Sequence, residues 1–122
     1  MKYPQILNSQ VSPYEATLKL QISAQLDAFA GHFDQFPIVP GVVQTQWALD
    51  YFKQLIAPEL NTQPTWSVDK VSALKFQHVI TPETDVNLNL SYDPAKHCLT
   101  FKFDNAEHNF SSGKLFFRDD KS

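Results

Sequence analysis

The sequence predicts an α+β fold in which one long central helix is wrapped by a curved antiparallel β-sheet. Three observations support this prediction. Residues 41–56 carry apolar side chains at helical spacing around most of the girth of the segment. Runs in which apolar and polar residues alternate precede and follow that segment, as half-buried strands do. Turn-forming residues separate the later runs, so neighbouring strands can pair as antiparallel hairpins.

The residues before the helix supply one clear strand. Residues 1–13 contain two prolines and little periodicity, which predicts a loose lead-in with room for one short strand. Residues 17–22 alternate apolar and polar side chains, which predicts a strand with one buried face. The side chains expected to face the core are Leu18, Leu20 and Ile22. Residues 27–30 are predicted to form a short turn.

The central helix is predicted to run from Gly41 to about Ile56, and Pro58 marks its end. Its apolar stripe follows i+4 spacing through Val43, Trp47, Tyr51 and Leu55, and is widened by Val42, Leu49 and Phe52. We interpret Trp47 and Tyr51 as core residues rather than binding residues. After a polar connection at 61–65, four further strands are predicted at 68–80, 86–92, 97–103 and 110–118. The predicted order is therefore a strand, the helix and a four-stranded meander.

Length and charge limit the class of protein. A chain of 122 residues is predicted to form a single domain, 1–122. A net charge of −3 and the absence of a Lys or Arg cluster argue against a nucleic acid partner. No apolar run has membrane-spanning length, and Met1 is not followed by the pattern of a secretory signal. With Cys98 as the single cysteine, we expect a soluble cytoplasmic protein and no membrane partner.

The segment from Gly31 to Gly41 is predicted to be a stiff loop that leads into the helix. Pro37 and Pro40 fix their own φ angles and favour extended conformations in the residues before them. Gly41 then opens the helical pattern, where the first backbone amides have no partner within the helix. These amides and the positive end of the helix dipole would suit a polarised carbonyl oxygen.

These residues resemble the signature of the hot-dog-fold β-hydroxyacyl-acyl-carrier-protein dehydratases, which reads approximately Gly-His-Phe-Pro-Gly-x-Pro-x-x-Pro-Gly-Val. The positions that match without a gap are His32, Phe33, Pro37, Pro40, Gly41 and Val42. Residues 74–82 are similar to a later strand and turn of the family, without its first proline. Residues 43–48 look closest to the small dehydratases of aryl polyene lipid clusters.

The resemblance implies specific roles at three catalytic positions. His32 matches the histidine that acts as acid and base on the substrate Cα proton, and Gly41 matches the glycine whose amide holds the thioester carbonyl. The family places Glu or Asp at the position of Gln46. An amide does not titrate near neutral pH, so Gln46 could orient a water or hydroxyl but not donate the proton itself. Asp50 and Asp34 are candidate replacement acids, although a solvated helix residue and a loop acid are the simpler interpretations.

The resemblance also implies an activity and its partners. The expected reaction is dehydration of β-hydroxyacyl chains to trans-2-enoyl chains on the phosphopantetheine arm of acyl carrier protein, with no cofactor of the enzyme's own. The expected assembly is a dimer. The departure at Gln46 motivates the hypothesis that, instead of a homodimer, the chain forms a heterodimer with a related hot-dog subunit whose acid faces His32. The residues expected to bind the acyl chain, with hydrophobic core as the alternative, are Phe33, Phe36, Ile38, Val39, Pro40 and Val42.

Two other functions remain open at this point. A hot-dog thioesterase would use the same helix end to hold the carbonyl while water attacks it. A non-catalytic acyl-binding subunit of a heteromeric dehydratase is the other alternative, and it would retain all measured activity after His32→Ala. No metal site is expected, because His78, His97 and His108 lack metal-ligand spacing to other donors.

Overall fold

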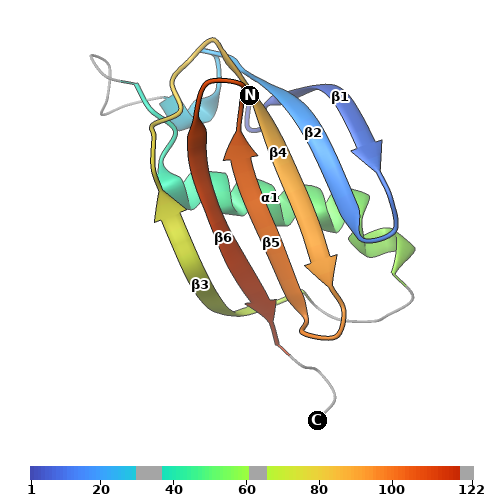
Figure 1. The fold of residues 1–122 in the computed structure, drawn as a ribbon. Helices are drawn as coiled ribbons and strands as arrows, with labels where there is room; N and C mark the ends of the chain where they lie inside the picture. The colour runs from blue at the N-terminus through green and yellow to red at the C-terminus, as the bar shows by residue number, and fades with distance from the viewer. Residues whose placement is uncertain (30–36, 61–65, 119–122) are drawn as a thin grey trace.

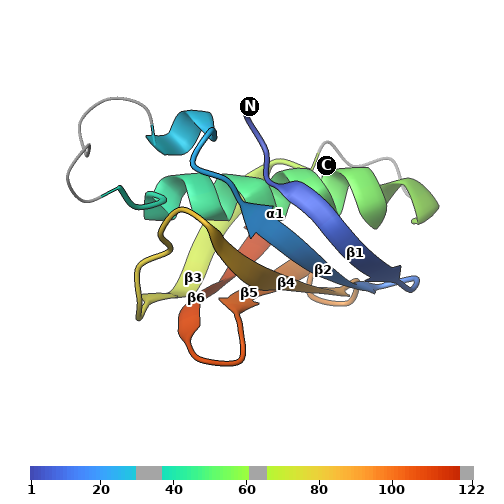
Figure 2. The same cartoon turned by 90° about the horizontal axis from the view of Figure 1, so that it is seen from above.

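The computed structural model describes residues 1–29, 37–60 and 66–118. In these residues one long helix lies along one face of a curved sheet of six antiparallel strands (Figure 1). Seen from above, the helix covers the inner face of the sheet (Figure 2). The strands are β1 (Gln5–Val11), β2 (Glu15–Ile22), β3 (Val68–Phe76), β4 (Thr84–Asp93), β5 (Cys98–Asp104) and β6 (Asn109–Phe117). The helix is α1 (Gly41–Leu55), and short 3-10 turns form η1 (Asp27–Phe29) and η2 (Ala57–Glu59).

The core lies between α1 and the sheet. Alternate residues of the central strands point to the helix and are buried, which confirms the inward-facing set predicted for residues 17–22. The other face of these strands carries polar residues such as Lys19, Asn87 and Lys102. The buried side chains contributed by β2, β4 and β5 are Ala16, Leu18, Leu20, Ile22, Val86, Leu88, Leu90, Tyr92, Cys98, Leu99, Phe101 and Phe103.

The order of the strands corrects the predicted meander. The sheet runs β1-β2-β4-β5-β6-β3, so β3 pairs with β6 at the far edge and not with β4. The chain after β3 crosses back over the end of the sheet, where Glu83 donates its amide to the carbonyl of Ile22. Pairing of consecutive strands is the commoner arrangement, and here the long crossover replaces it.

The amino-terminal segment also differs from the predicted loose lead-in. Residues 5–11 form the full edge strand β1, which pairs with β2 from Gln5 opposite Gln21 to Val11 opposite Ala16. Most side chains of β1 are exposed, so its sequence lacks the alternation that marks a half-buried strand. Backbone hydrogen bonds to β2 hold this strand in place rather than burial of an apolar face.

The bounds predicted for the helix are confirmed, but one side of its predicted apolar stripe is wrong. It begins at Gly41 and ends at Leu55, with Ala57–Glu59 forming the turn at Pro58. Val42 was predicted to widen the buried stripe, but its side chain is 77% exposed. The buried face is instead formed by Gln44, Trp47, Ala48, Tyr51 and Phe52. Val42 lies outside this face because the helix presents residues three and four apart to the sheet.

Candidate active site

The candidate site is built around the first turn of α1. Pro40 precedes the helix with φ −59° and ψ 147°, and its carbonyl accepts the amides of Val43 and Gln44. The amides of Gly41 and Val42 find no acceptor among the described residues. They are the free donors that the loop motif predicts, and they lie at the positive end of the helix dipole. An oxygen that gains negative charge during a reaction would be stabilised there.

Phe76 packs directly against Gly41. A Cβ atom placed on Gly41 would lie 2.5 Å from Cζ of Phe76 and 2.7 Å from its Cε1. Glycine is therefore needed at this position for the approach of the ring, because any side chain would displace it. Phe76 is the last residue of β3 and is 51% exposed. One face of the helix start is thus covered by an aromatic side chain from the sheet edge.

Two buried polar side chains hold the helix start to the sheet. Ser111 in β6 donates from Oγ to Oε1 of Gln44 at 2.6 Å. Gln44 donates from Nε2 to the carbonyl of Val39 at 3.0 Å. The amide of Val39 donates in turn to the carbonyl of Ile80 at 2.9 Å. The residue that precedes Pro40 is therefore bonded through both of its backbone polar groups.

An apolar groove of about 470 Å³ opens beside these groups. His78 lines this groove, and its ring stacks on that of His108 with the centroids 3.8 Å apart. The residues that line the groove are Ile38, Val39, Gly41, Gln44, Phe76, Gln77, His78 and Val79.

Gln46 faces a different groove on the side of α1. Its Nε2 donates to Oδ1 of Asp50 at 2.8 Å, and the hydroxyl of Tyr3 donates to Oδ2 of Asp50 at 2.7 Å. Both carboxylate oxygens of Asp50 are therefore engaged. Val42 and Gln46 line this second groove together with residues of the amino-terminal segment.

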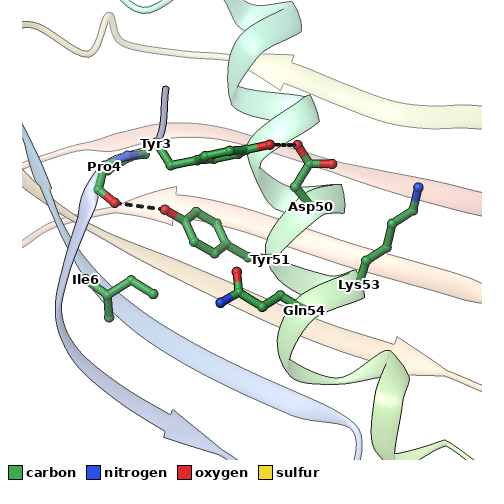
Figure 3. A pocket seen from close by; sticks show the side chains of 7 residues that line it. All are labelled: Tyr3, Pro4, Ile6, Asp50, Tyr51, Lys53 and Gln54. Atoms are coloured by element: carbon green, nitrogen blue, oxygen red, sulfur yellow. Dashed lines mark hydrogen bonds between the residues drawn. The ribbon is translucent and has the colours of Figure 1, made fainter. Parts of the chain in front are cut away.

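A third groove, of about 660 Å³, follows the second half of α1 (Figure 3). In this view Tyr3 reaches Asp50, and the hydroxyl of Tyr51 donates to the carbonyl of Pro4 at 3.0 Å. Lys53 and Gln54 of the helix complete the wall. These bonds fasten residues 1–4 along the helix, and they are joined by the bond from Trp47 Nε1 to the carbonyl of Lys2 at 3.3 Å.

The bonds in this segment change the acidity of two phenols. The hydrogen bond to Asp50 raises the pKa of Tyr3, and burial and the Asp50 charge act in the same direction. Burial raises the pKa of Tyr51 to about 12, with smaller contributions from Tyr3 and Asp50. Both phenols are neutral at physiological pH, so they act as hydrogen-bond donors.

The predicted site residues separate into three groups. Ile38, Val39 and Gly41 lie together in the first groove, and Pro40 lies between them at the helix start. Val42 and Gln46 line the other groove, so within one chain Gly41 and Gln46 do not face the same space. The predicted residues that lie outside the described part of the chain are His32, Phe33, Asp34 and Phe36.

Sequence reasoning missed Gln44, Ser111 and Phe76. A signal for Gln44 was present, because it shares the helical spacing of Trp47, Ala48 and Tyr51 and therefore falls on the buried face. Ser111 lies in a polar stretch of β6, followed by Ser112, Gly113 and Lys114, and nothing local marks its side chain as buried. Phe76 belongs to the second, weaker motif, whose pairing with the helix start depends on the position of β3.

Two further features bear on the class of site. Among residues 1–29, 37–60 and 66–118, no group of three or more His, Cys, Asp or Glu side chains is arranged to hold a metal ion. Within the same residues no helix combines the length and apolar character needed to cross a bilayer.

Comparisons with known proteins bear on the family and the fold. A structure described as the dehydratase heterocomplex ApeI:P from Xenorhabdus doucetiae is similar, with a TM-score of 0.83 and 34% identity over 97% of this chain and 100% of that one. An uncharacterized protein from Erwinia carotovora subsp. atroseptica matches with a TM-score of 0.72 and 26% identity over 100% of this chain and 99% of that one. No significant match was found among curated protein sequences.

A more distant structure supports the fold alone. A variant of the PpsC dehydratase domain from Mycobacterium tuberculosis has a TM-score of 0.68 at 12% identity, over 100% of this chain and 46% of that one. The predicted hot-dog fold is thus confirmed. The family model for ApeI-like proteins, described as ApeI dehydratase, matches residues 8–114. This chain therefore belongs to the ApeI-like dehydratase family.

Proposed function

We propose that this chain is a subunit of an enzyme that dehydrates β-hydroxyacyl chains on acyl carrier protein to trans-2-enoyl chains. The observation that carries the proposal is the pair of open amides at Gly41 and Val42 beside an apolar groove, in a member of a dehydratase family. Dehydration next to a thioester places negative charge on the carbonyl oxygen when the Cα proton leaves. Backbone amides at a helix start are suited to stabilise that charge.

The proposed reaction assigns one role to each group. The imidazole of His32 removes the proton from Cα, and the Gly41 amide donates to the thioester carbonyl oxygen. The Cα–Cβ double bond forms as the hydroxyl leaves Cβ, and it departs as water after receiving a proton. The acyl chain lies along Ile38 and Val39, with the carrier arm entering from solvent. The chemistry requires no cofactor besides the phosphopantetheine of the carrier.

The proton for the leaving hydroxyl needs a separate source. Gln46 is an amide, and its Nε2 already donates to Asp50. The carboxylate of Asp50 accepts from Gln46 and Tyr3. We propose that a related hot-dog subunit supplies the acid, since the Xenorhabdus relative is described as a dehydratase heterocomplex.

The β3 edge is the proposed contact with that subunit. An edge strand presents unpaired backbone groups and invites another strand to pair with it. Apolar side chains on β3 and on the residues that follow it are also exposed. One of them, Phe76, contacts Gly41, so a subunit bound at this edge would border the first groove. These side chains are Val71 (46%), Leu74 (43%), Phe76 (51%) and Val79 (48%).

Two valines of equal exposure provide a matched test of this contact. Val71 in β3 and Val11 in β1 are both 46% exposed, on opposite edges of the sheet. Val71→Lys is expected to dissociate the assembly in light scattering, and Val11→Lys is expected to leave it intact. The proposed contact is wrong if the two variants behave alike.

An assay on the purified chain tests the reaction. We expect slow dehydration of a β-hydroxyacyl carrier thioester by the chain alone, and a higher rate for Gln46→Glu, because this change restores a titratable acid at the family position. His32→Ala is expected to abolish both rates. Release of free thiol would identify a thioesterase instead. Full activity of the wild-type chain alone would contradict the partner-supplied acid.

A non-catalytic acyl-binding subunit is the second candidate. The observation that favours it is the Gln46–Asp50 pair, which leaves no free carboxylic acid at the family's acid position. In the complex with a related subunit, this alternative predicts that His32→Ala leaves the dehydration rate unchanged. The proposed dehydratase role predicts that the same variant removes it.

A further inference from the structure

Gln44 and Ser111 are the two polar residues buried in the core among the described residues, at 3% and 1% exposure. Burying polar side chains is costly unless they are hydrogen-bonded, and these two bond to each other at 2.6 Å. A pair of apolar residues would fill the same space without this requirement. A specific need for directional bonds at this place would account for the pair.

The pair lies directly beneath the helix start. In the sheet, Ser111 is opposite Phe76 on one side and opposite Phe103 on the other. Residues directly opposite each other in antiparallel strands point to the same face, so this row of three faces α1. Phe76 contacts Gly41 and Ser111 bonds Gln44. One row of the sheet therefore meets the first turn of the helix at two points.

The second bond of Gln44 reaches the backbone before the helix. Its Nε2 donates to the carbonyl of Val39, whose amide donates to Ile80. The ring of Pro40 fixes its φ angle, and its carbonyl accepts two amides of the first helical turn, which holds its ψ angle. With both angles held, the orientation of the Val39 carbonyl sets the direction of the Gly41 amide.

We propose that Gln44 and Ser111 are positioning residues that set the Gly41 amide against the first groove for the developing charge on the thioester oxygen. This inference rests on the proposed dehydratase function and adds two residues to its machinery. Gln44 acts on the Val39 carbonyl, and Ser111 holds the Gln44 amide in the orientation that makes Nε2 the donor. Neither side chain is required to touch the substrate.

Measurements of kcat and KM distinguish a positioning role of Gln44 from a role in folding alone. Gln44→Met keeps the length and volume of the side chain but removes both polar atoms. We expect kcat per folded molecule to fall about 10- to 100-fold, since a small misplacement of a catalytic group has this effect. KM is expected to stay within about twofold, because apolar contacts hold the acyl chain in both proteins. A purely structural role would reduce the folded fraction and leave kcat of the folded protein unchanged.

Substitutions of Ser111 are expected to lower kcat to different degrees. Ser111→Ala is expected to lower kcat less than Gln44→Met and to add nothing in the Gln44→Met background, because the two residues act as one unit. Ser111→Thr keeps the hydroxyl and is expected to restore most of the rate. Ser112→Ala is the matched control, since Ser112 is half-buried and points to the other face of β6. If Gln44→Met does not fold, the proposal is tested by comparing kcat of the Ser111 variants with that of the Ser112→Ala control.

Glycine labelling measures the position of the amide without an assay. The chain has three glycines, so a protein labelled with ¹⁵N-glycine gives three backbone amide signals, and Gly41→Ala assigns the one of interest. We expect Gln44→Met and Ser111→Ala to shift the Gly41 signal, and Ser112→Ala to leave it in place. An unmoved Gly41 signal, or an unchanged kcat despite a shift, overturns the inference. A wild type that stays inactive together with its partner subunit would refute the proposed dehydratase, whereas the Gly41 signal still decides whether the pair positions this amide.

Discussion

The two ends of α1 are held in different ways. The second half of the helix is fastened by large buried surfaces, in which Phe52 packs against Trp66, Tyr92 and Phe117 with ring centroids 4.9, 5.2 and 5.4 Å away. The first turn is held by a few directional bonds through Gln44 and by one ring against Gly41. Stability is therefore concentrated at one end of the helix, and the open amides at the other.

This difference has a physical reason. Dispersion and burial stabilise the fold but tolerate small shifts, whereas hydrogen bonds fix direction. A site that must place an amide against a charge needs direction more than total energy. We therefore expect substitutions in the second half of α1 to reduce stability, and substitutions at its start to reduce activity.

Phe52→Ala is expected to produce the largest effect on stability. The side chain is fully buried at 0% exposure and touches three aromatic rings, so its removal leaves a cavity. The expected loss is about 3–5 kcal/mol in the free energy of unfolding, measured by urea denaturation. Phe52→Leu should cost less than the alanine variant. A loss below about 1 kcal/mol for Phe52→Ala would contradict the contrast between the two ends.

Gly41→Ala tests the opposite end. The new methyl group would lie 2.5 Å from Cζ of Phe76, and the half-exposed ring can swing away at little cost. We expect the free energy of unfolding to change by less than about 1 kcal/mol and kcat to fall about tenfold or more, because the displaced ring enters the groove. Adding Phe76→Ala should recover part of the rate. Failure of the double variant to recover would show that the methyl group, and not the ring, blocks the amide.

Tyr51→Phe affects the amino-terminal segment. Removing the hydroxyl leaves the carbonyl of Pro4 without its donor, which is expected to cost about 1–2 kcal/mol. The pKa of Tyr51 is raised from 10.0 to about 12, so between these values the unfolded chain loses its proton first. The stability of the wild type therefore falls as pH rises from about 10 towards 12. The Phe variant should show a shallower decline in urea denaturation across that range, and an identical decline would contradict this assignment.

The elements that the sequence predicted correctly are those whose periodicity reflects burial. The segment 17–22 alternates because one face of β2 contacts α1, and 41–56 has helical spacing because α1 is covered by the sheet. The length of β1 was underestimated because it is an exposed edge strand. The place of β3 in the sheet was predicted wrongly because only its long-range pairing with β6 determines that place. Periodicity reports which side of an element is buried, and it contains no information about which strand lies next to another.

The residues of the candidate site show the same difference. The helix start at Gly41 was predicted from a local motif of prolines and glycine, which a sequence displays directly. Gln44, Ser111 and Phe76 meet only because β3 and β6 lie side by side beneath the helix start. Ranking the helix residues by apolar character misses Gln44, although the spacing of Gln44 places it on the buried face. A polar residue at a core position is the signal to examine in such a sequence.

Asp50→Asn is expected to have the smallest effect of these four substitutions on stability and activity. Asp50 lies on the side of α1 away from the first groove, and it accepts bonds from Tyr3 and Gln46. The amide can retain the bond from Tyr3 but carries no charge, so the pKa of Tyr3 should move back towards 10.0. Titration of tyrosinate by ultraviolet absorbance measures this shift. Stability should change by less than about 1 kcal/mol, because the two partners of Asp50 are exposed to solvent. A large loss of kcat in this variant would instead identify Asp50 as the replacement acid, and would extend the site from the helix start to its second groove.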